Sequence, residues 1–186
     1  MESIQKLEQR WAFEKNHPLF KSGHFVLHPG TIKGGPYVAM TPWVVSEFCT
    51  IDYAIWFPPD EDPENVKSEI EDYIGSISKM DLWLEQNPPE IEWKLYFPSS
   101  SVNQDHPLVQ ACAQAHAIST GEVAKIEGFR AVCDATWLNK KGIPTIIYGP
   151  GDLIVAHAEN EYVEIKQVMD AAKTYASLIM NWCGLQ

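Results

Sequence analysis

The hydrophobic residues of positions 2–15 recur every three or four residues, which predicts an amphipathic helix. The same spacing recurs after Pro63, where a proline in the first turn followed by Glu64 is typical of a helix start. Each helix therefore has one apolar stripe to bury. The stripes consist of Ile4, Leu7 and Trp11 in the first helix and of Val66, Ile70, Ile74, Ile77 and Met80 in the second.

Three further segments of the first half predict strands. Residues 25–32 predict a weak strand interrupted by Pro29, whereas residues 49–57 and 91–97 alternate apolar and polar positions with the period of two that a sheet requires. The order helix, strand, strand, helix, strand favours an α+β fold, with an antiparallel sheet and both helices on one of its faces.

A different pattern begins near residue 105. Helices are predicted over 106–119 and 133–140, short strands near 124–126 and over 143–148, and a long helix at the end of the chain. This alternation predicts βαβ units with a parallel sheet, and hence two domains, 1–104 and 105–186. The core stripe of the terminal helix consists of Ile165, Val168, Ala172, Tyr175, Ile179 and Trp182.

Charge narrows the range of partners. The 186 residues carry 14 Lys and Arg against 25 Asp and Glu, a formal charge of −11. Such a field repels nucleic acid and anionic membranes, so neither is expected as a partner. The sequence shows neither a signal peptide nor an apolar run of membrane-spanning length, and its four cysteines form no CxxC pair, so we expect a reduced, cytoplasmic protein.

Candidate chemistry lies between the 143–148 segment and the terminal helix. The sequence Gly149-Pro150-Gly151 has two interpretations. It is either a plain turn or a site where small residues let backbone N–H groups approach a ligand oxygen. His157 follows in a loop. Its imidazole is either solvated or, in the neutral form, a ligand of the kind that Zn²⁺ binds. Asp134 precedes a predicted helix, where an N-cap would explain it. Glu161 is expected to stabilise the start of the terminal helix.

Three segments of the second half resemble the C-terminal signature of the zinc-dependent M20 peptidase/deacetylase family. They are Gly142–Gly151, Ala156–Val163 with its His157, and Cys133-Asp134-Ala135. The resemblance implies a ferredoxin-like lid over 1–104 and the end of the zinc-binding catalytic domain over 105–186. It implies that His157 is a zinc ligand and that Gly149, Pro150, Gly151 and Asp134 bind substrate.

Motifs of the first half are similar to one branch of that family. They are Glu69–Gly75, Asp81–Leu84, Asn87-Pro88-Pro89 and Trp93. The branch holds acetylornithine deacetylases and formyl-aminopyrimidine deformylases, so a small-molecule N-acyl substrate is implied. In such enzymes zinc polarises the amide carbonyl while a glutamate base activates water.

The chain departs from the family pattern in its metal site. The family's His-x-Asp ligand pair, bridging Asp and Glu-Glu pair do not occur in these 186 residues, and the lid's first strand would lie before Met1. We therefore assign no catalytic residue and expect the isolated chain to be inactive, with weak or no zinc binding. The expected partner is a complementary N-terminal catalytic segment or a second copy. The alternative is a non-catalytic module, derived from the lid, for oligomerisation or small-molecule binding.

Overall fold

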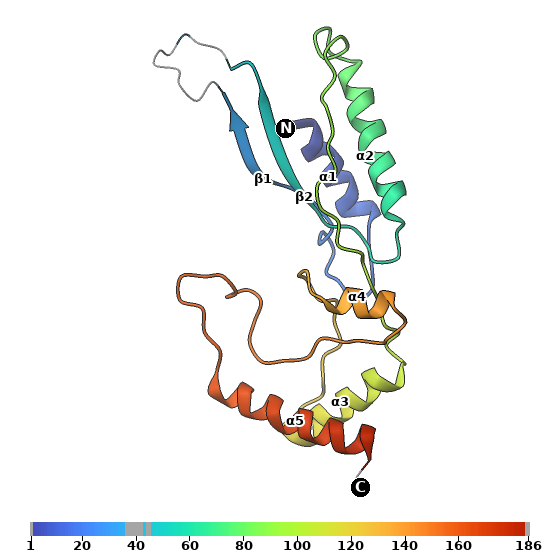
Figure 1. The fold of residues 1–186 in the computed structure, drawn as a ribbon, viewed down its shortest axis with the longest axis vertical. Coiled ribbons are helices and arrows are strands. Elements are labelled where there is room, and N and C mark those ends of the chain that lie inside the picture. Colours follow the sequence, from blue (N-terminus) through green and yellow to red (C-terminus); the bar gives the residue numbers. More distant parts are fainter. Residues whose placement is uncertain (1, 36–42, 44–45, 185–186) are drawn as a thin grey trace. The chain divides into compact units, whose positions relative to one another are not determined.

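The computed structural model describes residues 2–35, 43 and 46–184, and the chain divides into two compact units, 1–94 and 95–186. Figure 1 shows the elements of both units. Within the described ranges no helix is both long enough and apolar enough to cross a membrane.

Two antiparallel strands, β1 (Leu27–Gly34) and β2 (Cys49–Ile55), form the sheet of the first unit. The ladder begins with Leu27 opposite Ile55, and its register shifts just after Pro29. The irregularity follows from the proline, which has no N–H to donate to a ladder and is tolerated in strands at bulges and edges. The first strand thus begins two residues later than the sequence predicted.

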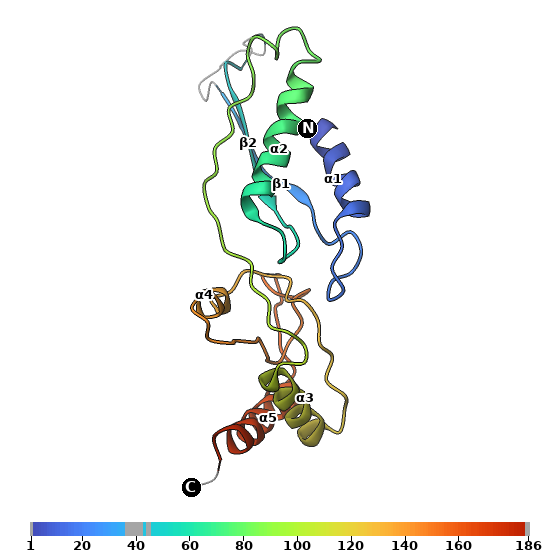
Figure 2. The same ribbon diagram turned by 90° about the vertical axis from the view of Figure 1, so that its right-hand side faces the viewer.

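The helices α1 (Glu2–Glu14) and α2 (Pro63–Ser78) lie on the same face of this sheet, as Figure 2 shows and as the sequence predicted. The side chain of Asp62 caps α2 by accepting a hydrogen bond from the Glu64 N–H at 3.0 Å, and Pro63 occupies the first helical position, where its missing N–H costs nothing. Residues of the two helical stripes meet the sheet in one core, made of Leu7, Trp11, Leu27, Val66 and Ile70. The prediction is wrong for Met80, which lies beyond the end of α2 and is exposed.

One carboxylate, that of Glu69 on α2, ties the two helices together. It accepts hydrogen bonds from Arg10 at 2.6 Å and from Trp11 Nε1 at 2.9 Å, and it pairs with Lys15 Nζ at 3.2 Å. Lys15 is only 9% exposed, and Glu61 is its second partner. Burial alone raises the pKa of Glu69, but the bonds from Trp11, Lys15 and Arg10 outweigh it and leave the pKa below its ordinary value.

Residues 91–97 are not a strand, contrary to the prediction from their alternation. Trp93 and Lys94 nevertheless contact the rest of the first unit through their side chains. Trp93 Nε1 donates to Glu71 at 2.6 Å, and Lys94 donates to Asp52 at 2.7 Å. Alternation alone does not make a strand, which also needs a neighbouring strand for its backbone N–H and C=O groups.

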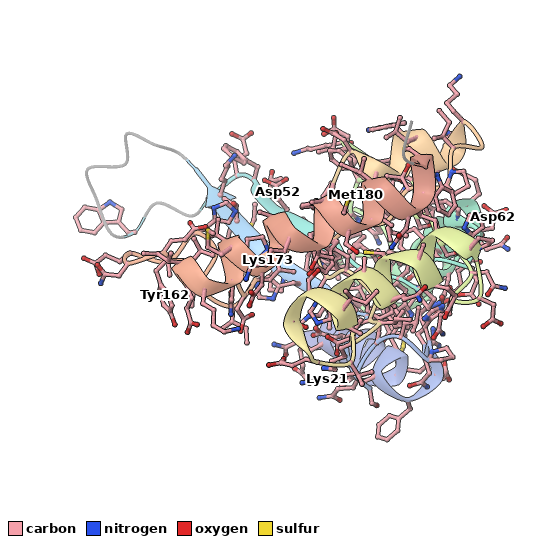
Figure 3. The ribbon with its side chains drawn as sticks, turned by 90° about the horizontal axis from the view of Figure 1, so that it is seen from below. Lys21, Asp52, Asp62, Tyr162, Lys173 and Met180 are labelled. Carbon is pink, nitrogen blue, oxygen red and sulfur yellow. The ribbon has the colours of Figure 1, made fainter. Side chains whose placement is uncertain are left out.

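The second unit is built on two packed helices, α3 (Pro107–Thr120) and α5 (Ile165–Cys183), which lie side by side in Figure 3. The His106 ring accepts from the Leu108 N–H at 3.1 Å at the start of α3, and Gly121 ends the helix in the left-handed region. A short helix, α4 (Ala135–Lys140), lies between them in sequence. The buried residues of α3 and α5 are Val109, Cys112, Ala115, Ala171 and Thr174.

The parallel sheet predicted for this unit is wrong for the described residues, because neither 124–126 nor 143–148 forms a strand. In the second segment a side chain takes the place of a neighbouring strand at one residue, Thr145. Asn139 on α4 accepts from the Thr145 N–H at 2.8 Å and donates to the Thr145 carbonyl at 2.9 Å, as a paired strand would. The described chain is thus α and β mixed, with one two-stranded antiparallel sheet and five helices, and the ferredoxin-like lid stays a prediction.

Replacing Glu69 by Gln is expected to lower the free energy of unfolding by about 1–2 kcal/mol, because a charge-assisted acceptor shared by three donors is lost. The difference from wild type should be full above pH 4.5, the ordinary pKa of Glu69, and should shrink as pH falls through the lowered pKa of the folded state. Urea unfolding at several pH values measures it.

The matched control is Glu2→Gln, which removes the same charge from an exposed pair with Lys6. This variant should stay within about 0.5 kcal/mol of wild type. Equal effects of the two substitutions would contradict the role assigned to Glu69.

Candidate functional site

Tyr148 is the last residue before the Gly-Pro-Gly turn, and helices α3 and α5 both hold it. Its hydroxyl lies 2.8 Å from His116 Nδ1 and 3.1 Å from Thr174 Oγ1. The Tyr175 hydroxyl donates to the Tyr148 backbone carbonyl, and the two rings meet edge to face with centroids 5.6 Å apart. Burial, more than its neighbours Cys112 and Tyr148, raises the pKa of Tyr175, so this donor keeps its proton through the neutral range.

The other end of the turn is held as well. The Gly151 N–H donates to Oε1 of Gln167, in the first turn of α5, at 2.9 Å. Gly151 has a φ of +97°, a conformation that side chains rarely adopt. A Cβ added there would also lie 3.8 Å from Val163, so the turn needs glycine for its backbone conformation more than for space.

His157 lies at the centre of a loop with its own hydrogen bonds. It is exposed and has a φ of +62°, and it is the single residue other than glycine found at positive φ in the described ranges. The Glu161 carboxylate accepts from the His157 N–H at 3.0 Å. The expectation that Glu161 stabilises the start of the terminal helix is therefore wrong, because α5 begins at Ile165 and this carboxylate is used on the loop.

Asp134 stands immediately before α4 but does not cap it. Its φ of −72° and ψ of −12° are helical, and its side chain makes no capping hydrogen bond. The N-cap explanation for this residue is thus wrong. The carboxylate is exposed, and among the described residues no hydrogen bond joins it to the turn or to His157. Its assignment as a substrate-binding residue stays a prediction.

The donors of the described residues do not make a complete metal site. No group of three or more His, Cys, Asp or Glu side chains there is placed to hold a metal ion. His157 offers one imidazole, and the Glu161 carboxylate in its loop is engaged with backbone. A zinc site normally has four donors, so His157 alone does not make one, and its assignment as a zinc ligand stays a prediction.

Sequence reasoning missed the residues that hold the turn. These residues are His116, Gln167 and Thr174. A signal was present, because Gln167 and Thr174 are seven residues apart and therefore share one face of the terminal helix. Their partners, however, lie 16 and 26 residues away in sequence, beyond the reach of a periodicity argument.

Comparison with known proteins places these features in a family context. A model described as peptidase family M20/M25/M40 matches residues 18–181. The chain is 35% identical over 190 residues to an N-formyl-4-amino-5-aminomethyl-2-methylpyrimidine deformylase of Bacillus subtilis (strain 168). This match covers 97% of this chain and 44% of that protein. A deformylase of the same name from Halalkalibacterium halodurans is 31% identical over 195 residues, covering 100% of this chain and 45% of the relative. The chain thus spans less than half the length of the relatives it matches.

The positive φ of His157 predicts a difference between two substitutions that both remove the imidazole. The free energy of unfolding of His157→Gly should be about 1 kcal/mol higher than that of His157→Ala, because the left-handed conformation is unfavourable for alanine and not for glycine. Urea unfolding followed by fluorescence measures this difference. Equal stabilities would show that the loop does not hold residue 157 at positive φ.

Proposed function

The chain belongs to the peptidase family M20/M25/M40, and on that premise we propose that it is the C-terminal part of a metal-dependent hydrolase that removes a formyl or acyl group from an N-acylated amine. The observation that carries the proposal is the similarity to two deformylases along nearly the whole chain. Those relatives are named for removing a formyl group from an aminomethylpyrimidine, and a substrate of that class is the first to test.

The geometry of the second unit agrees with this role. The exposed His157 can be approached by a metal ion, and its backbone is fixed by the Glu161 carboxylate. The turn at 149–151 is fixed at both ends and presents backbone to solvent. In the proposed enzyme His157 supplies one zinc ligand and the turn binds an oxygen of the substrate, while the remaining ligands and the general base come from a segment outside these 186 residues.

A second candidate function is an interaction module without catalysis, and exposed apolar side chains favour it. Val123 is 93% exposed, and Met80 and Leu82 are each 87% exposed. Apolar groups this open to water are typical of surfaces that associate. The proposed partner is a second copy of the chain or the complementary catalytic segment.

A chimeric enzyme tests the hydrolase proposal. The matched 44% of the Bacillus subtilis deformylase is replaced by this chain, and formate release from that enzyme's N-formyl substrate is measured with zinc present. The chimera should be active, and His157→Ala should reduce its kcat/KM roughly 100-fold or more, as expected for loss of a metal ligand.

The control is His28→Ala, which removes an exposed imidazole from β1. It should leave kcat/KM within about twofold, as is usual for surface substitutions away from a site. An active chimera whose kcat/KM does not change with His157→Ala would contradict the assignment of His157 as a metal ligand. A folded but inactive chimera would argue against the hydrolase proposal itself.

Association of the isolated chain tests the second candidate. Sedimentation velocity across a hundredfold range of concentration should reveal a dimer or larger species that dissociates on dilution, because apolar side chains such as Val123 are then shielded from water. Leu82→Lys and Val123→Lys should shift the equilibrium toward monomer. A monomer at every concentration would contradict the self-association.

A further inference from the structure

The hydrogen bonds around Tyr148 have one direction that satisfies all of them. Thr174 Oγ1 lies 2.9 Å from the Asp170 carbonyl, which can only accept, so the Thr174 hydroxyl donates there. The Tyr148 hydroxyl must then donate to Thr174, and His116 Nδ1 must donate to Tyr148. A neutral His116 therefore carries its proton on Nδ1 and leaves Nε2 unprotonated.

The same reasoning fixes the side chain of Gln167. Because Gly151 contributes an N–H, the atom that faces it at 2.9 Å must be the carboxamide oxygen, and the NH₂ group points away. The Gly151 N–H is thus hydrogen-bonded within the protein and is not available to a ligand. Pro150 has no N–H, and among the described residues no backbone or side-chain group accepts a hydrogen bond from the Gly149 N–H.

Taken together, these contacts assign a role that the turn's sequence does not reveal. We propose that His116, acting through Tyr148, and Gln167, acting through Gly151, are positioning residues that leave the Gly149 N–H as the turn's one backbone donor to a ligand. The inference rests on the proposed function, since it specifies how the acyl-binding turn of that enzyme is held and used.

One free donor limits the chemistry that the turn can recognise. A single N–H donates to one acceptor oxygen, such as that of a formyl or acyl carbonyl or one oxygen of a carboxylate. It cannot bind both oxygens of a carboxylate. Space permits this, because a Cβ placed on Gly149 would have no heavy atom within 4 Å. The second oxygen of an anionic substrate would have to be bound by another part of the enzyme.

The tautomer of His116 tests the first half of the proposal in the full 186-residue chain. Long-range ¹H–¹⁵N spectra above pH 8 should show His116 protonated at Nδ1, whereas Tyr148→Phe should restore the usual preference for Nε2–H because the acceptor is gone. The helix content of this variant, measured by circular dichroism, should not change. An Nε2–H tautomer in the wild-type chain would overturn the role of His116.

Amide exchange at Gly151 tests the second half, with two variants of one residue. Gln167→Leu removes the acceptor and should speed exchange of the Gly151 N–H roughly five- to tenfold, whereas Gln167→Glu keeps an acceptor oxygen and should preserve protection. The comparison separates the hydrogen bond from any general effect of altering α5. Equal exchange in the two variants would overturn the role of Gln167.

Titration with sodium formate, the probe for a single acceptor group, tests the consequence. The amide resonance of Gly149 should shift while that of Gly151 does not, and in Gln167→Leu both should shift. A wild-type response at Gly151, or none at Gly149, would overturn the proposal. These readouts need no catalysis, so an inactive chimera combined with the expected spectra would reject the hydrolase and retain the held turn.

Discussion

Helix α5 is the element on which the candidate site depends. Gln167 and Thr174 are seven residues apart, about 10 Å along the helix axis, and each holds a different end of the Gly149–Gly151 turn. Because a helix is rigid over two turns, the separation of the turn's ends is set by the helix and not by the loop itself. The packing of α3 against α5 adds His116 to the same group. A loop that would otherwise sample many conformations is thereby held in one.

Polar contacts join the helices of the first unit in a comparable way. The carboxylate of Glu69 binds α1 through Arg10 and Trp11, above a core in which Trp11 is fully buried. Both units are small, and both leave large apolar side chains open to water. Exposed apolar side chains of this kind are compatible with both proposals, the hydrolase and the interaction module. The two candidates differ in what covers that surface, not in how the chain folds.

Periodicity was a good guide to the helices and to the one sheet. Helices α1, α2, α3 and α5 and strand β2 form where the sequence predicted them. The core stripe predicted for α5 is wrong, however, because residues such as Ile165 and Trp182 are exposed and the buried residues of this helix are Ala171 and Thr174. The alternating segment 91–97 and the short apolar segment 143–148 are not strands, and side chains such as Trp93 and Asn139 make their contacts. The candidate site divides in the same way. His157 and the glycines could be found because a motif is local in sequence. His116 and Thr174 could not, because the Tyr148 hydroxyl that joins them lies 32 and 26 residues away.

The central claim is that this chain carries one ligand of a metal site that other residues complete. Calorimetric titration of zinc into the isolated chain and into the deformylase chimera tests it most directly. The account predicts saturable binding by the chimera and no saturable binding by the chain alone at micromolar zinc, since a single imidazole does not hold the ion. One equivalent bound tightly by the isolated chain would contradict the account, and so would a folded chimera that binds none.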